Sequence, residues 1–117
     1  MKRHAVITGA GTGIGAACAT SLHSHGFRVT LLGRRCEPIN QIRNELGNNA
    51  IAYPCDVTKA ENVEEAFTYA RKQHGPISVI VNSAGIAPTE PFKKLDEASW
   101  RKTLDVNLTG CFLITKE

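Results

Sequence analysis

The amino-terminal part of the chain carries the glycine-rich segment TGAGTGIG at positions 8–15, directly after a short apolar run. Glycine permits positive φ angles and lets a ligand approach the backbone closely. A helix that begins here offers unpaired N–H groups and the positive end of its dipole, which together suit a phosphate group. The preceding strand and following helical pattern predict a dinucleotide-binding turn rather than an ordinary glycine-rich turn. The expected ligand contacts are Thr8, Gly9, Gly11, Thr12, Gly13, Ile14 and Gly15.

A second candidate position follows the apolar run 27–32. In dinucleotide-binding parallel sheets, the residues after the second strand contact the adenosine ribose of the ligand. A carboxylate there would accept hydrogen bonds from the ribose hydroxyls of NAD(H), but the chain has Gly33, Arg34 and Arg35. Glycine leaves space, and the guanidinium of Arg34 can form a fork of hydrogen bonds to a 2′-phosphate. We therefore expect NADP(H), with NAD(H) as the alternative cofactor. Solvated loop charges are the alternative interpretation of the two arginines.

Two further motifs stand where later apolar runs end. Asp56 and Val57 follow the run 50–55, and a carboxylate there can accept a hydrogen bond from the exocyclic amine of adenine. The run 77–82 ends at Asn82, and the small residues Ala84 and Gly85 leave room for a nucleotide ribose. Asn82 is also expected to tie neighbouring strand ends together. A turn aspartate and a capped turn are the simpler interpretations of these motifs taken singly.

The composition excludes several other classes of site. The four cysteines show no CxxC spacing and the four histidines no metal-like pattern, so no metal ligand is expected. Reduced thiols and the lack of a secretory signal predict a cytoplasmic protein. The net charge of +3 comes mainly from scattered basic residues, which predicts no nucleic-acid partner. No apolar run approaches the roughly 20 residues that span a bilayer, so no membrane partner is expected.

Apolar runs and helical patterns alternate along the chain and predict the elements that position these residues. Strands are expected at 4–8, 27–32, 50–55 and 77–82. Helices are expected at 13–25, from Pro38 to 46, after Thr58 to 74, and from Asp96 to the end. This order predicts an α/β fold with a doubly wound, Rossmann-like parallel sheet in the strand order 3-2-1-4. Pro54 cannot donate to a strand ladder, so the third strand should lie at an edge.

Local signals refine the helices. Thr58 and Glu61 predict a capping box, and Asp96 predicts the N-cap of the last helix. Asn107 stands within that helix, where asparagine has poor propensity. It is expected to bend the helix, hold a water molecule, or face solvent. The first helix should present one apolar face formed by Ile14, Cys18 and Leu22.

The fourth predicted strand should have neighbours on its far side, and the sequence supplies none. Residues 1–117 are therefore expected to form the N-terminal half of an NAD(P)-binding domain, truncated before its remaining strands.

Together these motifs resemble the short-chain dehydrogenase/reductase family over essentially the whole chain. The glycine segment resembles the family's cofactor motif, and Asp56-Val57 its adenine-ring position. The segment 82–85 resembles the family's Asn-Asn-Ala-Gly motif, with Ser83 in place of the second asparagine. Asn107 matches the asparagine of the family's catalytic tetrad, Asn-Ser-Tyr-Lys.

The resemblance implies hydride transfer between a nicotinamide and a small carbonyl or alcohol substrate. In the family a tyrosine is the general acid/base, a lysine lowers its pKa, a serine steadies the substrate oxygen, and the asparagine holds a water. This chain has no Tyr-x-x-x-Lys, since Val57 and Gln73 stand four positions after Tyr53 and Tyr69. The resemblance therefore implies an active parent enzyme, a homodimer or homotetramer built through the last helix, and a chain that is inactive alone.

Three other interpretations remain open. A non-catalytic dinucleotide-binding module would bind the cofactor without turnover. A Rossmann methyltransferase would usually have a carboxylate where Gly33 stands. An inert truncated product would have no function of its own.

Overall fold

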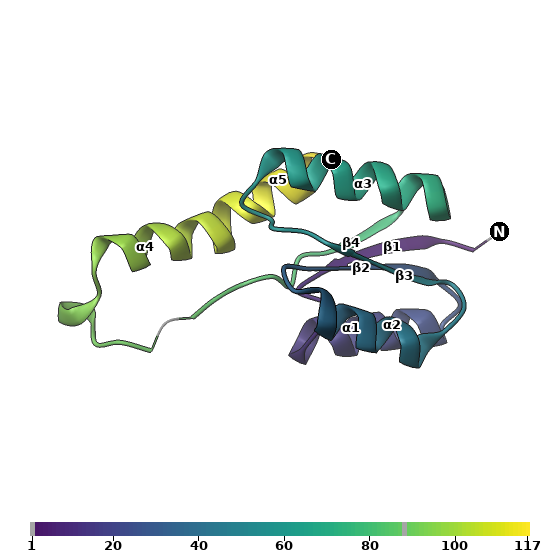
Figure 1. Cartoon of the computed structure of the whole chain (residues 1–117), viewed down its shortest axis with the longest axis horizontal. Helices are drawn as coiled ribbons and strands as arrows, with labels where there is room; N and C mark the ends of the chain where they lie inside the picture. Colours follow the sequence, from purple (N-terminus) through teal and green to yellow (C-terminus); the bar gives the residue numbers. More distant parts are fainter. Residues whose placement is uncertain (1, 88) are drawn as a thin grey trace.

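The computed structural model describes residues 2–87 and 89–117, which form a four-stranded parallel sheet in the order β3-β2-β1-β4 (Figure 1). The strands are β1 His4–Thr8, β2 Arg28–Gly33, β3 Ala50–Pro54 and β4 Val79–Val81. The helices are α1 Gly13–Ser24, α2 Cys36–Leu46, α3 Ala60–His74, α4 Glu97–Leu104 and α5 Gly110–Lys116. A 3-10 helix covers Phe92–Lys94, and a π-helical segment, Asp105–Thr109, joins α4 to α5. The predicted fold class and strand order are confirmed, and Pro54 lies on an edge strand as expected.

Helices cover both faces of the sheet, with α1 and α2 on one face and α3 and α5 on the other (Figure 1). β1 is buried along its whole length because it lies between β2 and β4. Ala5 and Ile7 belong to the core on the α1–α2 side, whereas Val6 packs with Phe67 of α3 and Ile114 of α5. Such alternation is typical of a doubly wound sheet. Because all four strands are parallel, their carboxyl ends lie at one edge of the sheet, where ligands bind in folds of this class.

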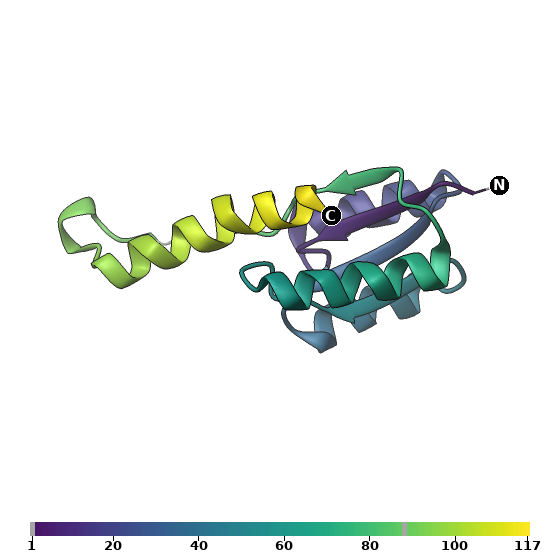
Figure 2. The ribbon, with the colours of Figure 1, turned by 90° about the horizontal axis from the view of Figure 1, so that it is seen from above.

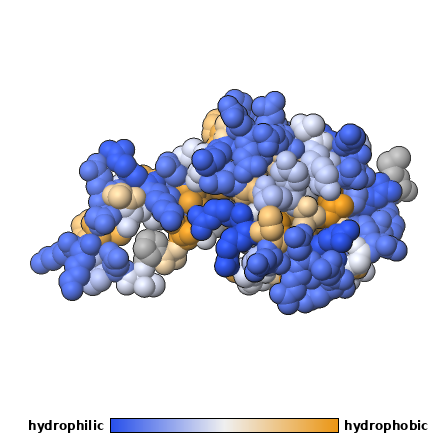
Figure 3. Space-filling view, viewed as in Figure 1, coloured by the Kyte–Doolittle hydropathy of each residue, from blue (hydrophilic) through white to orange (hydrophobic). Residues whose placement is uncertain are grey.

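The 3-10 helix, α4 and the π-helical turn (residues 92–109) project away from the sheet, and we call this segment the arm (Figure 2). With the arm, the molecule has a long axis of 51 Å. Apolar side chains remain exposed along the arm and on α5, and Figure 3 shows apolar surface where the arm meets the body. These side chains, which are 40–85% exposed, are Phe92, Trp100, Leu104, Leu108 and Phe112. Within the described residues, no helix has the length and apolar character needed to cross a membrane.

Two local predictions are wrong. Thr58 and Glu61 form no capping box: α3 begins at Ala60, and the Thr58 hydroxyl donates to the Asp56 carboxylate at 2.6 Å instead. Of the predicted apolar face of α1, Leu22 packs against the core and Cys18 is half-buried, but Ile14 is 78% exposed and Gly15 and Ala19 are buried instead.

The N-cap of α4 is as predicted, because the Asp96 carboxylate accepts a hydrogen bond from the Ser99 amide at 2.7 Å. The helix that it starts continues to Lys116 but is interrupted by the π-helical turn. Asn107 lies within this turn, at the position where a bend was one of the expectations.

Candidate functional site

The loops at the carboxyl ends of the strands border a cavity of about 220 Å³. It brings together eight of the predicted contact residues: Gly9, Gly11, Thr12, Arg34, Asp56, Val57, Ala84 and Gly85. Thr8, Asn82 and Asn107 instead line a smaller hollow of about 50 Å³, which shares Val57, Ala84 and Val106 with the cavity. Gly13, Ile14 and Gly15, at the start of α1, are outside the lining of both.

Two glycines of the turn are required by packing. Gly9 has a φ of +58°, and a Cβ there would lie 2.9 Å from the backbone nitrogen of Ala84. A Cβ at Gly15 would overlap the carbonyl group of Gly9 and lie 3.1 Å from the Ser83 hydroxyl oxygen. These two positions therefore let α1, the turn and the segment after β4 pack against one another without intervening side chains.

Gly13 differs from these glycines because it borders open space. Its φ is +56°, and a Cβ there would meet no described atom within 4 Å. The N-cap residue Thr12 makes no side-chain cap hydrogen bond, and the first turn of α1 holds no acidic residue. The first-turn N–H groups and the helix dipole thus remain available, so this end of α1 has the chemistry of a phosphate site.

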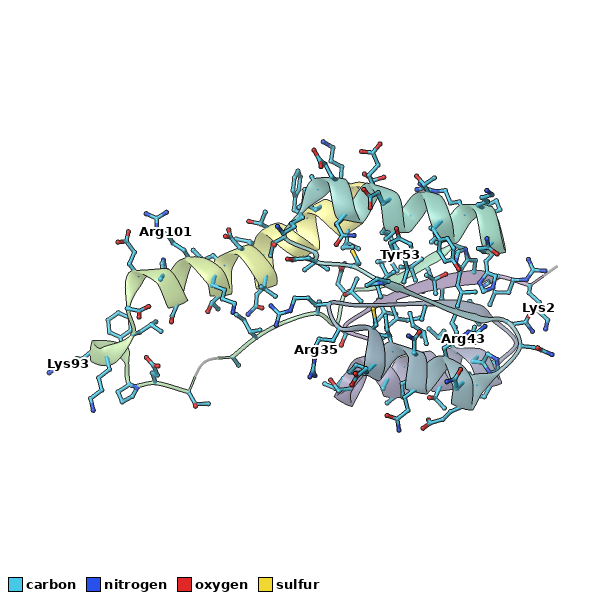
Figure 4. The ribbon with its side chains drawn as sticks, viewed as in Figure 1. Lys2, Arg35, Arg43, Tyr53, Lys93 and Arg101 are labelled. Carbon is cyan, nitrogen blue, oxygen red and sulfur yellow. The ribbon has the colours of Figure 1, made fainter. Side chains whose placement is uncertain are left out.

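The end of β2 presents positive charge at the cavity. Arg34 and Arg35 both line it and are exposed, and Figure 4 shows Arg35 at the end of the body that faces the arm. A Cβ at Gly33 would lie 2.6 Å from Cγ2 of Ile39. Gly33 therefore also allows the first turn of α2 to pack closely on β2, a second reason for glycine here that the sequence did not indicate.

Asp56 is held in a tight turn between β3 and α3. Its Oδ1 accepts hydrogen bonds from the Thr58 hydroxyl at 2.6 Å and the Thr58 amide at 3.0 Å. The Thr58 hydroxyl lowers the pKa of Asp56 most; the Thr58 amide and the charges of Lys59 and Arg34 add to this, against a raising effect of partial burial. Asp56 is therefore a carboxylate at neutral pH and accepts hydrogen bonds without donating them.

Thr8 fixes the start of the segment after β4. Its hydroxyl accepts hydrogen bonds from the amides of Ser83 and Ala84, each at 3.0 Å, and the residue is 1% exposed. Asn82 donates to the Thr115 hydroxyl of α5 at 3.1 Å. The tie between strand ends that we expected from Asn82 is thus made by Thr8, whereas Asn82 links β4 to a helix.

Asn107 uses its whole carboxamide on one partner. Its Oδ1 accepts from the Ile86 amide and its Nδ2 donates to the Ile86 carbonyl, both at 2.8 Å. Asn107 lies in the π-helical turn, and its side chain lies close to the segment after β4. A Cβ at Gly85 would be only 3.2 Å from the Asn107 Oδ1. Asn107 therefore positions the loop beside the cavity through its side chain.

Several residues of the site were missed by the sequence reasoning. Pro38 packs against Gly11, whose Cβ would lie 2.6 Å from the Pro38 Cβ, and Asn62 binds the backbone on both sides of Cys55. Neither residue belongs to a recognisable motif. A proline or asparagine in the first turn of a helix is common for local reasons, so the sequence held no signal that distinguished them.

Comparison with known proteins agrees with this geometry. The model of the short chain dehydrogenase family matches residues 3–117. An uncharacterized oxidoreductase of Staphylococcus aureus is 36% identical over 96% of this chain and 49% of its own length. Nodulation protein G of a Rhizobium species is 35% identical over 98% of the chain and 47% of its own length. The chain thus spans about half the length of the curated relatives that it matches.

Solved structures show the same fold. The 3-ketoacyl-(acyl-carrier-protein) reductase from Brucella melitensis, solved with NADH, superposes with a TM-score of 0.95 at 28% identity, covering 97% of this chain and 47% of its own. Actinorhodin polyketide ketoreductase, solved with NADPH, superposes with a TM-score of 0.94 at 32% identity, covering 98% and 45%. By the match over nearly its full length, the chain belongs to the short chain dehydrogenase family.

Proposed function

We propose that this chain is the cofactor-binding half of an NADP(H)-dependent oxidoreductase, which transfers hydride between the nicotinamide and a small carbonyl or alcohol substrate. One observation carries the proposal: Gly11 and the α1 N-cap residue Thr12, Asp56, and the arginines after β2 line a single cavity at the carboxyl edge of the sheet. The similar reductases solved with NADH and NADPH add support. When bound, the cofactor supplies the hydride donor or acceptor.

The chain's own residues divide the work of binding. The first turn of α1, with Gly13 open to the ligand, would hold the pyrophosphate, and Asp56 would accept from the adenine amine. Arg34 would pair with the 2′-phosphate, because a guanidinium forms charge-assisted hydrogen bonds with phosphate oxygens. With no carboxylate at the end of β2 to bind ribose hydroxyls, NADP(H) is favoured over NAD(H).

Asn107 would contribute through its main chain. Both polar groups of its side chain are hydrogen-bonded to Ile86, so a water in a proton relay would bind a backbone carbonyl of the π-helical turn instead. Turns of this type are frequent at functional sites because they break the regular helix hydrogen bonds. Residues 1–117 contain no Tyr-x-x-x-Lys motif, so they supply no counterpart of the tyrosine and lysine of the family's tetrad.

A binding module without catalysis is the second candidate. The described lining of the cavity includes no tyrosine and no lysine, and Tyr53 and Tyr69 pack against each other at 4.9 Å instead. The intact mass of the natural protein separates the two candidates. A mass near twice that of 117 residues is expected for the enzyme, whereas a mass equal to it would favour the binding module.

The exposed apolar side chains of the arm support assembly into a homodimer or homotetramer, because exposed apolar patches mark interaction sites. Sedimentation of the natural protein tests this, and a monomer at micromolar concentration would exclude it.

Cofactor preference is tested by titrating NADPH and NADH into the wild type, Arg34→Ala and the control Arg43→Ala. Arg43 is an exposed arginine of α2 outside the cavity lining. Arg34→Ala should weaken NADPH binding by about 10- to 100-fold and leave NADH unchanged, since one charged hydrogen-bonding group is lost. If the wild type binds NADH more tightly, or Arg34→Ala binds NADPH normally, the preference for NADP(H) is wrong.

A further inference from the structure

The turn between β3 and α3 carries Asp56, whose carboxylate lines the cavity and would accept from the adenine amine. This residue lies outside both elements. Asp56 stands two residues beyond the end of β3 and four before α3 begins. β3 is an edge strand of the four-stranded sheet, so its neighbour in the sheet is β2 alone. Backbone hydrogen bonds hold part of the turn, because the Cys55 amide donates to the Gly33 carbonyl at 2.8 Å and the Lys59 amide to the Asp56 carbonyl at 3.1 Å. The Asp56 amide and the Asp56 carboxylate, by contrast, are held by side chains and by the Thr58 amide.

Asn62 reaches into this turn from the first turn of α3. Its Oδ1 accepts a hydrogen bond from the Asp56 amide at 2.6 Å, and its Nδ2 donates to the Pro54 carbonyl at 3.3 Å. One carboxamide thus binds the backbone on both sides of Cys55. The helix behind it is well anchored, because Val63 and Phe67 are each 1% exposed in the core.

This arrangement differs from an ordinary helix cap. In a capping box, the side chain at the third helical position bonds to the amide of the N-cap residue. Asn62 holds that third position, but it bonds six residues back to Asp56 instead of to the N-cap residue Lys59. Its hydrogen bonds therefore stabilise the turn and its aspartate rather than the start of the helix.

Thr58 completes the geometry from the other side. Both of its hydrogen bonds to Asp56 fall on Oδ1, so within the described residues Oδ2 is the carboxylate oxygen left for a ligand. Asn62 fixes the backbone of Asp56 and Thr58 fixes its carboxylate. Together they define where the free oxygen lies in the cavity wall.

We propose that Asn62 is a positioning residue for adenine recognition: it holds the Asp56 backbone so that the carboxylate meets the exocyclic amine of the cofactor. This inference rests on the proposed function, because it needs an adenine nucleotide in the cavity. Asn62 itself need not touch the ligand, so its effect should depend on the amine that Asp56 recognises.

The experiment compares NADPH with its hypoxanthine analogue, which lacks the exocyclic amine, in the purified protein. Dissociation constants for both are measured by calorimetry in wild type, Asn62→Ala, Asn62→Asp and the control Asn40→Ala. Asn40 is an exposed asparagine of α2 outside the cavity lining. The wild type and the control should prefer NADPH by about tenfold, since the amine bonds to a charged acceptor.

Asn62→Ala should reduce that preference about three- to tenfold, through weaker NADPH binding and nearly unchanged binding of the analogue. Asn62→Asp keeps the acceptor for the Asp56 amide but replaces the donor to the Pro54 carbonyl with an acceptor oxygen, so its preference should fall at least about twofold. If the alanine variant does not fold, the aspartate variant carries the test. A preference that stays at the wild-type level then overturns the inference.

Two other outcomes separate this inference from the proposed function. If wild type binds neither nucleotide, the proposed function fails and the inference falls with it. If wild type prefers NADPH but Asn62→Ala weakens both ligands equally, the proposed function stands and the positioning role of Asn62 is overturned, because a merely structural defect does not distinguish the two ligands.

Discussion

Replacing Gly15 with alanine tests whether the cofactor turn is held in place by close packing. A Cβ at this position would overlap the carbonyl oxygen of Gly9 and lie 2.8 Å from its carbonyl carbon. Ordinary van der Waals contact begins at 3.4 Å, so the turn or α1 must move by at least 0.6 Å, the difference between these distances. The Ser83 hydroxyl oxygen, 3.1 Å away, limits the movement on the other side.

The cost follows from what surrounds the new methyl group. Inserting a methyl group into a well-packed region costs about 1–3 kcal/mol, and backbone neighbours give way less than side chains do, so we expect about 3 kcal/mol here. The shifted turn should also bind NADPH about tenfold more weakly, because it carries the residues that lead into the first turn of α1. Urea unfolding measures the first effect and calorimetric titration the second.

Gly26→Ala is the matched control. Gly26 follows α1 at its other end, has a φ of +90°, and has no described atom within 4 Å of its Cβ position. Alanine there should cost only the backbone strain of about 1–2 kcal/mol and leave NADPH binding unchanged. If Gly15→Ala is destabilised by less than about 1 kcal/mol and binds NADPH normally, the turn is not held by the contacts described above.

Three further predictions concern other parts of the molecule. Asn107→Ala should lower the free energy of unfolding by about 1–3 kcal/mol, because both polar groups of Ile86 lose a 2.8 Å partner; urea denaturation measures this, and an unchanged midpoint would contradict it. Burial lowers the pKa of His74 from 6.5 to about 4, so the unfolded chain binds the proton more readily and stability should fall as the pH drops from about 6.5 towards 4. Thermal melts across this range should show a smaller fall in His74→Gln, whereas an identical fall would exclude His74 as the cause. Burial also raises the pKa of the Cys55 thiol to about 11, so iodoacetamide at pH 8 should alkylate the exposed Cys36 first, and mass spectrometry showing Cys55 labelled equally fast would contradict the burial.

The fold and the outline of the site could be predicted from the sequence because their signals are local. The alternating apolar runs predicted each end of the four strands to within two residues. The largest difference is at the fourth strand, which is shorter than expected. Residues at the ends of parallel strands must meet at one edge, so Arg34, Asp56 and Ala84 were expected near the glycine turn and do share one cavity.

The errors arose where a polar side chain had more than one possible partner. Thr58 had the local pattern of a helix cap, but its hydroxyl bonds to Asp56, two residues before it. Asn82 had the position to tie strand ends, but Thr8, a buried residue seventy-five positions before Ser83, makes that tie. Local patterns carry no information about which partner a polar group finds after folding, so such pairings become readable only in the structure.

The glycine segment shows that a sequence motif can have a second physical cause besides the ligand that it suggests. The sequence attributed its glycines to the approach of a phosphate, yet in the structure only Gly13 of the three with the motif's spacing borders open space. Gly9 and Gly15 are needed because α1 and the segment after β4 press against the turn from both sides. A turn packed in this way cannot shift freely when a ligand arrives, so the N–H groups at the start of α1 are already oriented before binding. Preorganisation of this kind reduces the entropy that a ligand loses on binding. Substitutions at Gly9 or Gly15 should therefore lower cofactor affinity by displacing the turn, even though only Gly9 lines the cavity. A side chain at Gly13 meets no described atom, so it should leave this packing unchanged.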